Sequence, residues 1–301
     1  MLRQTDHPFR RTVVCVTVAL SGLLAALLVA ARPSLPWIAT DRTDAVATAQ
    51  VQAAPGPVMF PLFGRKSGRL YDYEPKGTGG VQPAVDMGDG WAEADALVQS
   101  NVSEGGKGND LYHRIDGTLY YTAERGNDTK LVGAGWQIYD HLLSVGNMGG
   151  SVEPDLVAQH TDGTLWLYAG RSDGLFQPRM RIGAGGWGAM TALAGRGDYT
   201  GDGKADLLAR HSDGTLYLYP GTGNFVEDGV LGARITVGGG WNTYKLIVST
   251  GDNNGDGKTD LIAADTDGLL WLYKGTGNAS VPLAARVQVG TGGWAAFDRL
   301  F

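Results

Sequence analysis

Two short acidic loops carry the residues of this sequence that could bind a metal ion. Asp252–Asp260 reads DNNGDGKTD, and Asp198–Asp206 reads DYTGDGKAD. Side-chain oxygens alternate along a glycine-containing turn in both, and such flexible sets of hard oxygen ligands suit Ca²⁺. We therefore predict one Ca²⁺ in each loop. The predicted ligands, which include a backbone carbonyl from each lysine, are Asp198, Thr200, Asp202, Lys204 and Asp206, and Asp252, Asn254, Asp256, Lys258 and Asp260.

The loops do not continue as EF-hands. An EF-hand needs a carboxylate at position 12 and flanking helices, whereas position 12 of the second loop is Ala263 and strand-like residues follow. The alternative is a turn rich in Asp, Asn and Gly that needs no metal, although three carboxylates in one loop would repel each other without a cation. Asn101–Asp110 and Asn147–Asp155 resemble incomplete copies, and we assign no metal to them.

The loops belong to a repeat with a period near fifty residues. Five tryptophans, each preceded by glycine, are spaced 45, 51, 54 and 53 residues apart: Trp91, Trp136, Trp187, Trp241 and Trp294. Between them recur stretches such as DGTLYLY and DGLLWLY, whose alternation is typical of half-buried strands after a hairpin turn. With 47 glycines in the chain, this period predicts propeller blades rather than helical repeats.

The last unit shows how each blade is expected to be built. We predict four antiparallel strands at Tyr244–Ser249, Leu261–Ala264, Leu269–Tyr273 and Ala285–Val289, with the acidic loop between the first two. The chain thus contains enough units for an all-β, five-bladed propeller of four-stranded blades.

The two ends of the repeat region complement each other. The region begins in mid-blade at Val58–Phe63 and ends with an extra first strand in WAAFDRLF, Trp294–Phe301. We predict that this C-terminal strand becomes the innermost strand of the N-terminal blade, which closes the ring and removes a free sheet edge. The alternatives are five blades without this overlap, or a larger ring completed by dimerisation.

The order of these motifs resembles the FG-GAP/VCBS repeats of secreted bacterial proteins and of integrin α-chain propellers. The motifs are W-x-x-Y, then D-x-N-x-D-G-x-x-D, then L-I and D-G-x-L-x-L-Y, as they stand from Trp241 to Tyr273. The resemblance covers about Val58 to Phe301 and is most specific in the last two units. It implies that the acidic loop joins the first two strands of a blade and holds Ca²⁺.

The first 57 residues differ from the repeats. Arg3, Arg10 and Arg11 precede a run of 19 uncharged residues that contains the single cysteine, Cys15. We expect residues 1–31 to be a signal peptide or, alternatively, an uncleaved membrane anchor. Residues 32–57 are expected to be a disordered linker, and residues 58–301 to be the propeller. The domain would then be secreted or held outside the cell.

Little in the sequence indicates catalysis or nucleic-acid binding. The net charge is −6 with the basic residues scattered, which disfavours a nucleic-acid surface. The chain has no H-E-x-x-H, no G-x-S-x-G and no Gly-rich phosphate loop before a helix. We expect a protein that is not an enzyme; the alternative is a polysaccharide- or ester-cleaving enzyme whose site is assembled from several blades.

One aromatic residue recurs at the same place in every unit. Aromatics at equivalent positions usually pack between blades, but a ring beside polar groups can also stack on a sugar, an arrangement similar to that of five-bladed propeller lectins. We predict a monomeric, lectin-like module for surface glycans; the alternative is a protein-binding adhesion or toxin-assembly module with a cell-surface protein as partner. The predicted ligand-binding residues are Tyr71, Tyr120, Trp166, Tyr217 and Trp271.

Overall fold

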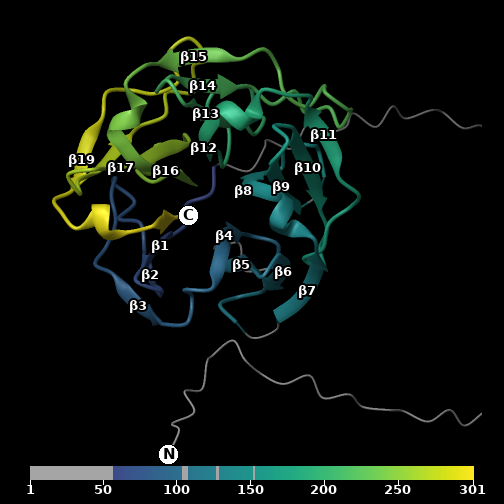
Figure 1. Cartoon of the computed structure of the whole chain (residues 1–301). Helices are drawn as coiled ribbons and strands as arrows, with labels where there is room; N and C mark the ends of the chain where they lie inside the picture. Colours follow the sequence, from purple (N-terminus) through teal and green to yellow (C-terminus); the bar gives the residue numbers. More distant parts are fainter. Residues whose placement is uncertain (1–56, 104–107, 127–128, 152) are drawn as a thin grey trace, which may run out of the picture. The chain divides into compact units, whose positions relative to one another are not determined.

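The described part of the chain folds as an all-β, five-bladed propeller. A computed structural model describes residues 57–103, 108–126, 129–151 and 153–301. In these residues twenty strands form five four-stranded antiparallel sheets, which surround a common centre (Figure 1). The predicted fold is confirmed, whereas the predicted signal peptide and nearly all of the predicted linker lie outside the described residues. No helix in the described part is long and apolar enough to cross a membrane.

Each blade uses its strands in the same order from the ring centre outwards. Blade 1 alone combines the two ends of the repeat region. From inside to outside, the strands are β20 (Arg299–Leu300), β1 (Leu62–Lys66), β2 (Arg69–Tyr73) and β3 (Val85–Gly88) in blade 1; β4 (Ala94–Ser100), β5 (Asp110–Ile115), β6 (Thr118–Thr122) and β7 (Thr129–Ala134) in blade 2; β8 (Tyr139–Gly146), β9 (Glu153–His160), β10 (Leu165–Gly170) and β11 (Met180–Gly183) in blade 3; β12 (Met190–Ala194), β13 (Leu207–His211), β14 (Leu216–Tyr219) and β15 (Ile235–Gly238) in blade 4; and β16 (Tyr244–Gly251), β17 (Asp260–Asp265), β18 (Leu270–Tyr273) and β19 (Val287–Gly290) in blade 5.

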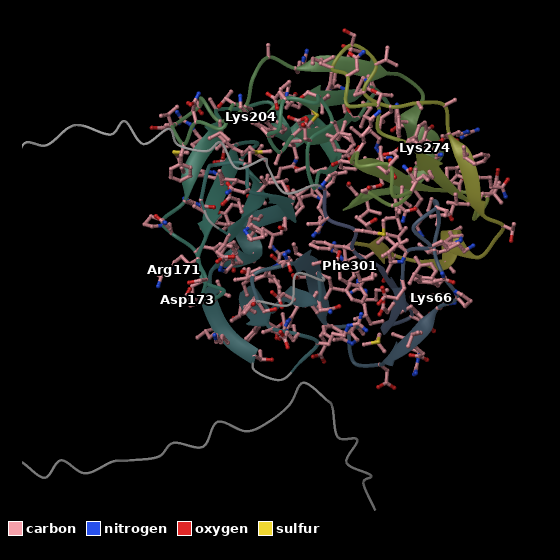
Figure 2. The ribbon with its side chains drawn as sticks, turned by 180° about the vertical axis from the view of Figure 1, so that it is seen from behind. Lys66, Arg171, Asp173, Lys204, Lys274 and Phe301 are labelled. Carbon is pink, nitrogen blue, oxygen red and sulfur yellow. The ribbon has the colours of Figure 1, made fainter. Side chains whose placement is uncertain are left out.

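The C-terminal strand closes the ring as predicted. β20 pairs with β1, with Gly64 opposite Leu300, and Phe63 and Phe301 exchange backbone hydrogen bonds of 2.9 and 3.0 Å. A Cβ at Gly64 would lie 2.7 Å from the Phe297 ring, so glycine lets the C-terminal segment approach β1. Figure 2 shows Phe301 near the middle of the ring.

The segment before β1 differs from its predicted role in blade 1. Phe60 N–H donates to the Thr250 carbonyl at 2.9 Å, and Asp252 N–H donates to the Val58 carbonyl at 2.7 Å. Residues 58–60 therefore lie along the end of β16 in blade 5. Pro61 follows this segment and interrupts the pattern of backbone donors before β1 starts.

The recurring Gly-Trp pairs share one packing arrangement. All five tryptophans are 6–7% exposed, and four of them open a 3₁₀ turn just before an innermost strand after a glycine with positive φ. In those four blades the ring packs on a tyrosine of the third strand at 4.7–4.8 Å. The four pairs are Trp136–Tyr168, Trp187–Tyr219, Trp241–Tyr273 and Trp294–Tyr73.

A long polar side chain fixes each junction between blades, and we call these five side chains the junction donors. Arg114, for example, donates from Nη1 to the carbonyls of Trp136 and Tyr139 at 2.6 and 2.7 Å, which lie at the start of blade 3. Blade 5 has Ala264 at the equivalent place on its second strand, and Lys245 on β16 donates to the next blade instead. The junction donors are Arg65, Arg114, Gln159, Arg210 and Lys245.

Removing residues 294–301 is predicted to destabilise the whole ring. The deletion takes away β20 and the apolar contacts of Trp294, Phe297 and Leu300 with blade 5 and blade 1, so β1 loses a ladder partner. Urea unfolding followed by tryptophan fluorescence should show one transition at a lower midpoint. A synthetic 294–301 peptide added in trans should restore part of the loss. A truncated protein that unfolds like the full chain would contradict this assignment of β20.

Candidate functional site

The two predicted calcium loops join the first and second strands of blades 4 and 5, as the family resemblance implies. The aspartate at position 1 organises each loop from within. Asp198 accepts N–H bonds from Gly201 at 2.6 Å and from Gly203 at 2.7 Å, and Asp252 does the same for Gly255 and Gly257. Both loops are therefore wrapped around a carboxylate at their first position.

The last aspartate of each loop is buried and bonded to the backbone. Asp206 accepts N–H bonds from Tyr199 and Thr200 at 2.9 Å each through Oδ2, and from Gly221, beyond the third strand, at 2.8 Å through Oδ1. The same pattern occurs in four blades, including the two whose loops we had considered incomplete. These four aspartates, each at most 1% exposed, are Asp110, Asp155, Asp206 and Asp260.

We call these four residues the hub aspartates, because each ties its loop to the end of the third strand of the same blade. A buried carboxylate that receives three backbone N–H bonds satisfies donors that would otherwise be left without partners. Asp155 plays this part in a loop whose first position is Asn147. The hub position therefore does not depend on a complete calcium-type loop.

The charges in the two complete loops are costly. Burial raises the pKa of Asp206 to about 6, and the nearby Asp198 carboxylate adds to the rise. Burial likewise raises the pKa of Asp260 to about 6, with smaller contributions from Asp256 and Asp252. A cation near these carboxylates would favour their ionised forms.

The donor set matches a hard cation in its chemistry, since carboxylate, hydroxyl, amide and carbonyl oxygens are the ligands that Ca²⁺ takes. The oxygen ligands do not, however, surround a single point. Asp202 lies 3.5 Å from the Lys204 ammonium at the surface, and the hub carboxylates are occupied by N–H donors. Among the described residues, no three His, Cys, Asp or Glu side chains are grouped closely enough to form a metal site.

Hub and calcium positions can be separated by substitution. Asp155→Asn should lower the free energy of unfolding by about 2–4 kcal/mol, because it replaces a buried acceptor of several N–H bonds by a group that is partly a donor. The loss should be the same with calcium and with chelator. Asp202→Asn, at an exposed position, should leave the stability in chelator unchanged. Urea titrations of both variants test this, and a loss in Asp155→Asn that disappears in chelator would contradict the hub role.

The five predicted ligand-binding aromatics lie one to a blade, on the third strands. All five are half-buried, in contrast to the buried Gly-Trp set. They are spread around the ring and do not meet in one pocket. The set comprises Tyr71 on β2, Tyr120 on β6, Trp166 on β10, Tyr217 on β14 and Trp271 on β18.

Three of these rings carry an arginine from the neighbouring outermost segment. The guanidinium carbon of Arg179 lies 4.0 Å from the centre of the Trp166 ring, and that of Arg286 lies 4.0 Å from the Trp271 ring. Arg234 stands over Tyr217 at 4.4 Å. All three arginines are exposed, so each position combines a half-buried aromatic ring with an exposed guanidinium over one of its faces.

The other two rings have different neighbours. Tyr120 stacks on His113 at 5.3 Å with an interplanar angle of 17°, and Tyr71 meets the edge of Phe297 at 5.9 Å. The Trp271 indole N–H is bonded to Asp265 at 2.7 Å. The five positions are thus equivalent in the repeat and unequal in their surroundings.

The described residues also form hollows that were not predicted from the sequence. The innermost strands enclose an axial channel of about 270 Å³, and an outer groove of about 630 Å³ lies between the 76–79 loop of blade 1 and strands β18 and β19 of blade 5. The groove combines Lys76, Thr78 and Gln288 with the apolar Leu272 and Val289. Its residues come from distant parts of the chain, so no local motif marks it.

His113, beside Tyr120, makes the stability of blade 2 depend on pH. Burial lowers the pKa of His113 to about 4, and the ring is packed between Tyr120 and Trp91. A histidine in the unfolded chain titrates near pH 6.5. Between these two values the unfolded state binds more protons at this position than the folded state does.

The protein should therefore lose stability through His113 as the pH falls from about 6.5 to about 4, by up to about 3 kcal/mol. His113→Gln should remove this component, so the difference in unfolding free energy between wild type and variant should shift across that window. The buried aspartates with raised pKa values increase the stability of the protein as the pH falls. Their contribution is the same in wild type and in His113→Gln, so it cancels in the difference between the two. His211→Gln, at a partly exposed site, serves as the control, and a pH-independent difference for His113→Gln would count against the assignment.

A match to a known family covers the two acidic loops. The family model for the FG-GAP-like repeat matches residues 198–263, from the first complete loop through the second. This stretch is similar to an FG-GAP-like repeat. The resemblance inferred from the motifs is thereby confirmed where it was most specific, and the FG-GAP-like match within a five-bladed propeller supports a binding or recognition module in general.

The FG-GAP-like repeat and the strand topology identify the fold more firmly than whole-chain similarity does. No curated protein sequence matches the chain significantly. Solved structures with some similarity are a nidogen/laminin complex, the periplasmic gluconolactonase PpgL of Pseudomonas aeruginosa and Sqt1 of Saccharomyces cerevisiae, at 10%, 13% and 12% identity. The matches cover 78%, 80% and 71% of this chain and 79%, 69% and 50% of those chains, with TM-scores of 0.42, 0.40 and 0.35.

Proposed function

We propose that this protein is a secreted, calcium-stabilised propeller that binds surface glycans through its third-strand aromatics. The observation that carries the proposal is the division of the aromatic residues into two sets. The Gly-Trp tryptophans are 6–7% exposed and belong to the core. The third-strand rings recur in every blade and stay half-exposed, although full burial would stabilise the fold more.

The surroundings of these rings suit a sugar. Saccharide binding combines an apolar surface for one face of the ring with polar groups that fix the hydroxyls. Beside Trp166 stand Thr164 and the exposed Arg179, and beside Trp271 stand Asp265 and Arg286. The outer groove adds a second polar surface with an apolar floor next to blade 5.

Calcium and secretion are part of the same proposal. The oxygen-only donor sets at Asp198–Asp206 and Asp252–Asp260, together with the raised pKa values of their hub aspartates, support Ca²⁺ as the natural counter-charge. The basic and then apolar residues 1–31 support export. Calcium would act by stabilising the folded loops, and we propose recognition rather than catalysis as the activity.

A glycan array run with calcium and with chelator tests the proposal. Wild type should retain a defined group of glycans, and Trp166→Ala or Trp271→Ala should weaken retention at least about fivefold, since losing a binding aromatic commonly costs about 1 kcal/mol or more. Val281→Ala, which alters an exposed apolar residue in the loop between β18 and β19, is the control and should bind normally.

The rival functions give different results. Failure of the wild type on a broad array would favour a protein-binding adhesion module. Turnover of polysaccharides or esters would favour a composite enzyme site. Melting temperatures of the tryptophan variants separate binding from folding, because a ring that only packs between blades should cost about 3–5 kcal/mol of stability when removed.

A further inference from the structure

The propeller axis contains a buried arginine between two cavities. The axial channel defined above is lined by the innermost strands, and a second hollow of about 210 Å³, the linker-side cavity, is bordered by Pro57, Val58 and Phe60. Arg196 and Ser144 line both. Arg196 therefore stands where the channel meets the segment that enters the ring.

Arg196 has only neutral partners among the described residues. It is 7% exposed; Nε donates to the Ser249 carbonyl at 3.2 Å and Nη2 to the Gln99 carbonyl at 3.0 Å. The guanidinium lies 4.8 Å from the Phe60 ring. No described carboxylate is within ion-pair distance of it, whereas Arg65 and Arg114 pair with Asp298 and Asp95.

A buried cation without a counter-charge is costly and uncommon. Burial lowers the pKa of Arg196 to about 10, so the group still carries its charge at neutral pH. A guanidinium has five N–H donors in a fork that suits two oxygens of one anion. The carbonyls of Gln99 in blade 2 and Ser249 in blade 5 accept from Nη2 and Nε, so the other N–H donors of the guanidinium are available to an anion.

The channel as a whole is cationic, although the chain carries a net charge of −6. The Nε of Arg299 is buried without a hydrogen-bond partner. A narrow, low-dielectric channel with an excess of one charge concentrates ions of the opposite sign. The ionisable side chains that line it are Arg196, Arg210, Lys245 and Arg299, with His141, and one side-chain carboxylate, that of Asp298.

We propose that the propeller axis binds a small oxyanion, a carboxylate or a sulfate-like ion, with the Arg196 guanidinium as its anchor and the Ser144 hydroxyl beside it. The two cavities of about 270 and 210 Å³ are at or below the lower end of typical pockets for larger organic ligands, which limits the occupant to a small ion. The site is separate from the third-strand aromatics and does not depend on the glycan proposal. Its bound ion would supply the negative charge that the described residues do not place next to Arg196.

The test is thermal unfolding in sodium sulfate and in sodium acetate. The wild-type melting temperature should rise with anion concentration by about 3–6 °C at tenfold excess over Kd, beyond the general effect of the salt on any folded protein. Arg196→Met measures that general effect and should lack the additional rise. Arg171→Met, at an exposed arginine that pairs with Asp173, should respond like wild type. Equal responses of wild type and Arg196→Met to both salts would overturn the proposal and leave Arg196 as a strut between blades.

If Arg196→Met does not fold, crystals of the wild type soaked in selenate decide the question. An anomalous peak within hydrogen-bonding distance of the Arg196 guanidinium, together with a reduced melting response to sulfate in Ser144→Ala, supports the site. A channel that holds only water at a saturating selenate concentration would reject it.

Discussion

Every junction in this ring depends on one interaction, a long donor side chain that reaches two carbonyls at the start of the next blade. Five such contacts must hold at once, because a ring has no end at which a misplaced blade could be accommodated. Arginine serves at three of the junctions, glutamine at one and lysine at one. The Gly-Trp turn that supplies one of the carbonyls is thereby fixed, and with it the tyrosine that packs on the tryptophan. The half-exposed third-strand rings and the axial channel follow from this alignment.

Much of this architecture could be predicted from local repetition. The Gly-Trp spacing and the alternating apolar pattern indicate five four-stranded blades, and the complementary ends indicate which strand closes the ring. Boundaries were less accurate: β18 begins at Leu270 rather than Leu269, because Leu269 N–H is held in the turn by Asp265. Residues 58–60 were assigned to the wrong blade, since their partner at Thr250 is almost two hundred residues away.

The candidate functional residues were also predicted only in part. Position within the repeat was enough to select the acidic loops and the third-strand aromatics. It was not enough to separate hub aspartates from predicted calcium ligands, because the hub role is defined by N–H groups at or just after the end of the third strand, such as those of Gly170 and Gly221. Asp155 thus looked like the remnant of a lost metal loop, whereas it forms the same contacts as Asp206. No sequence motif identifies Arg196 as a buried axial residue, because the residues around it come from different blades.

The closure of blade 1 has a consequence for the order of events during synthesis. Arg65 and Asp298, which pair across β1 and β20, are 233 residues apart in the chain. A nascent chain can assemble blades 2 to 5 from neighbouring segments, but β1 keeps an unpaired edge until residues 294–301 have been synthesised and have reached it. Such long-range pairing slows folding, and an open strand edge invites pairing with other chains. The time needed to synthesise residues 66–294 and to place β20 beside β1 thus determines how long this edge of the growing protein is open to misassembly.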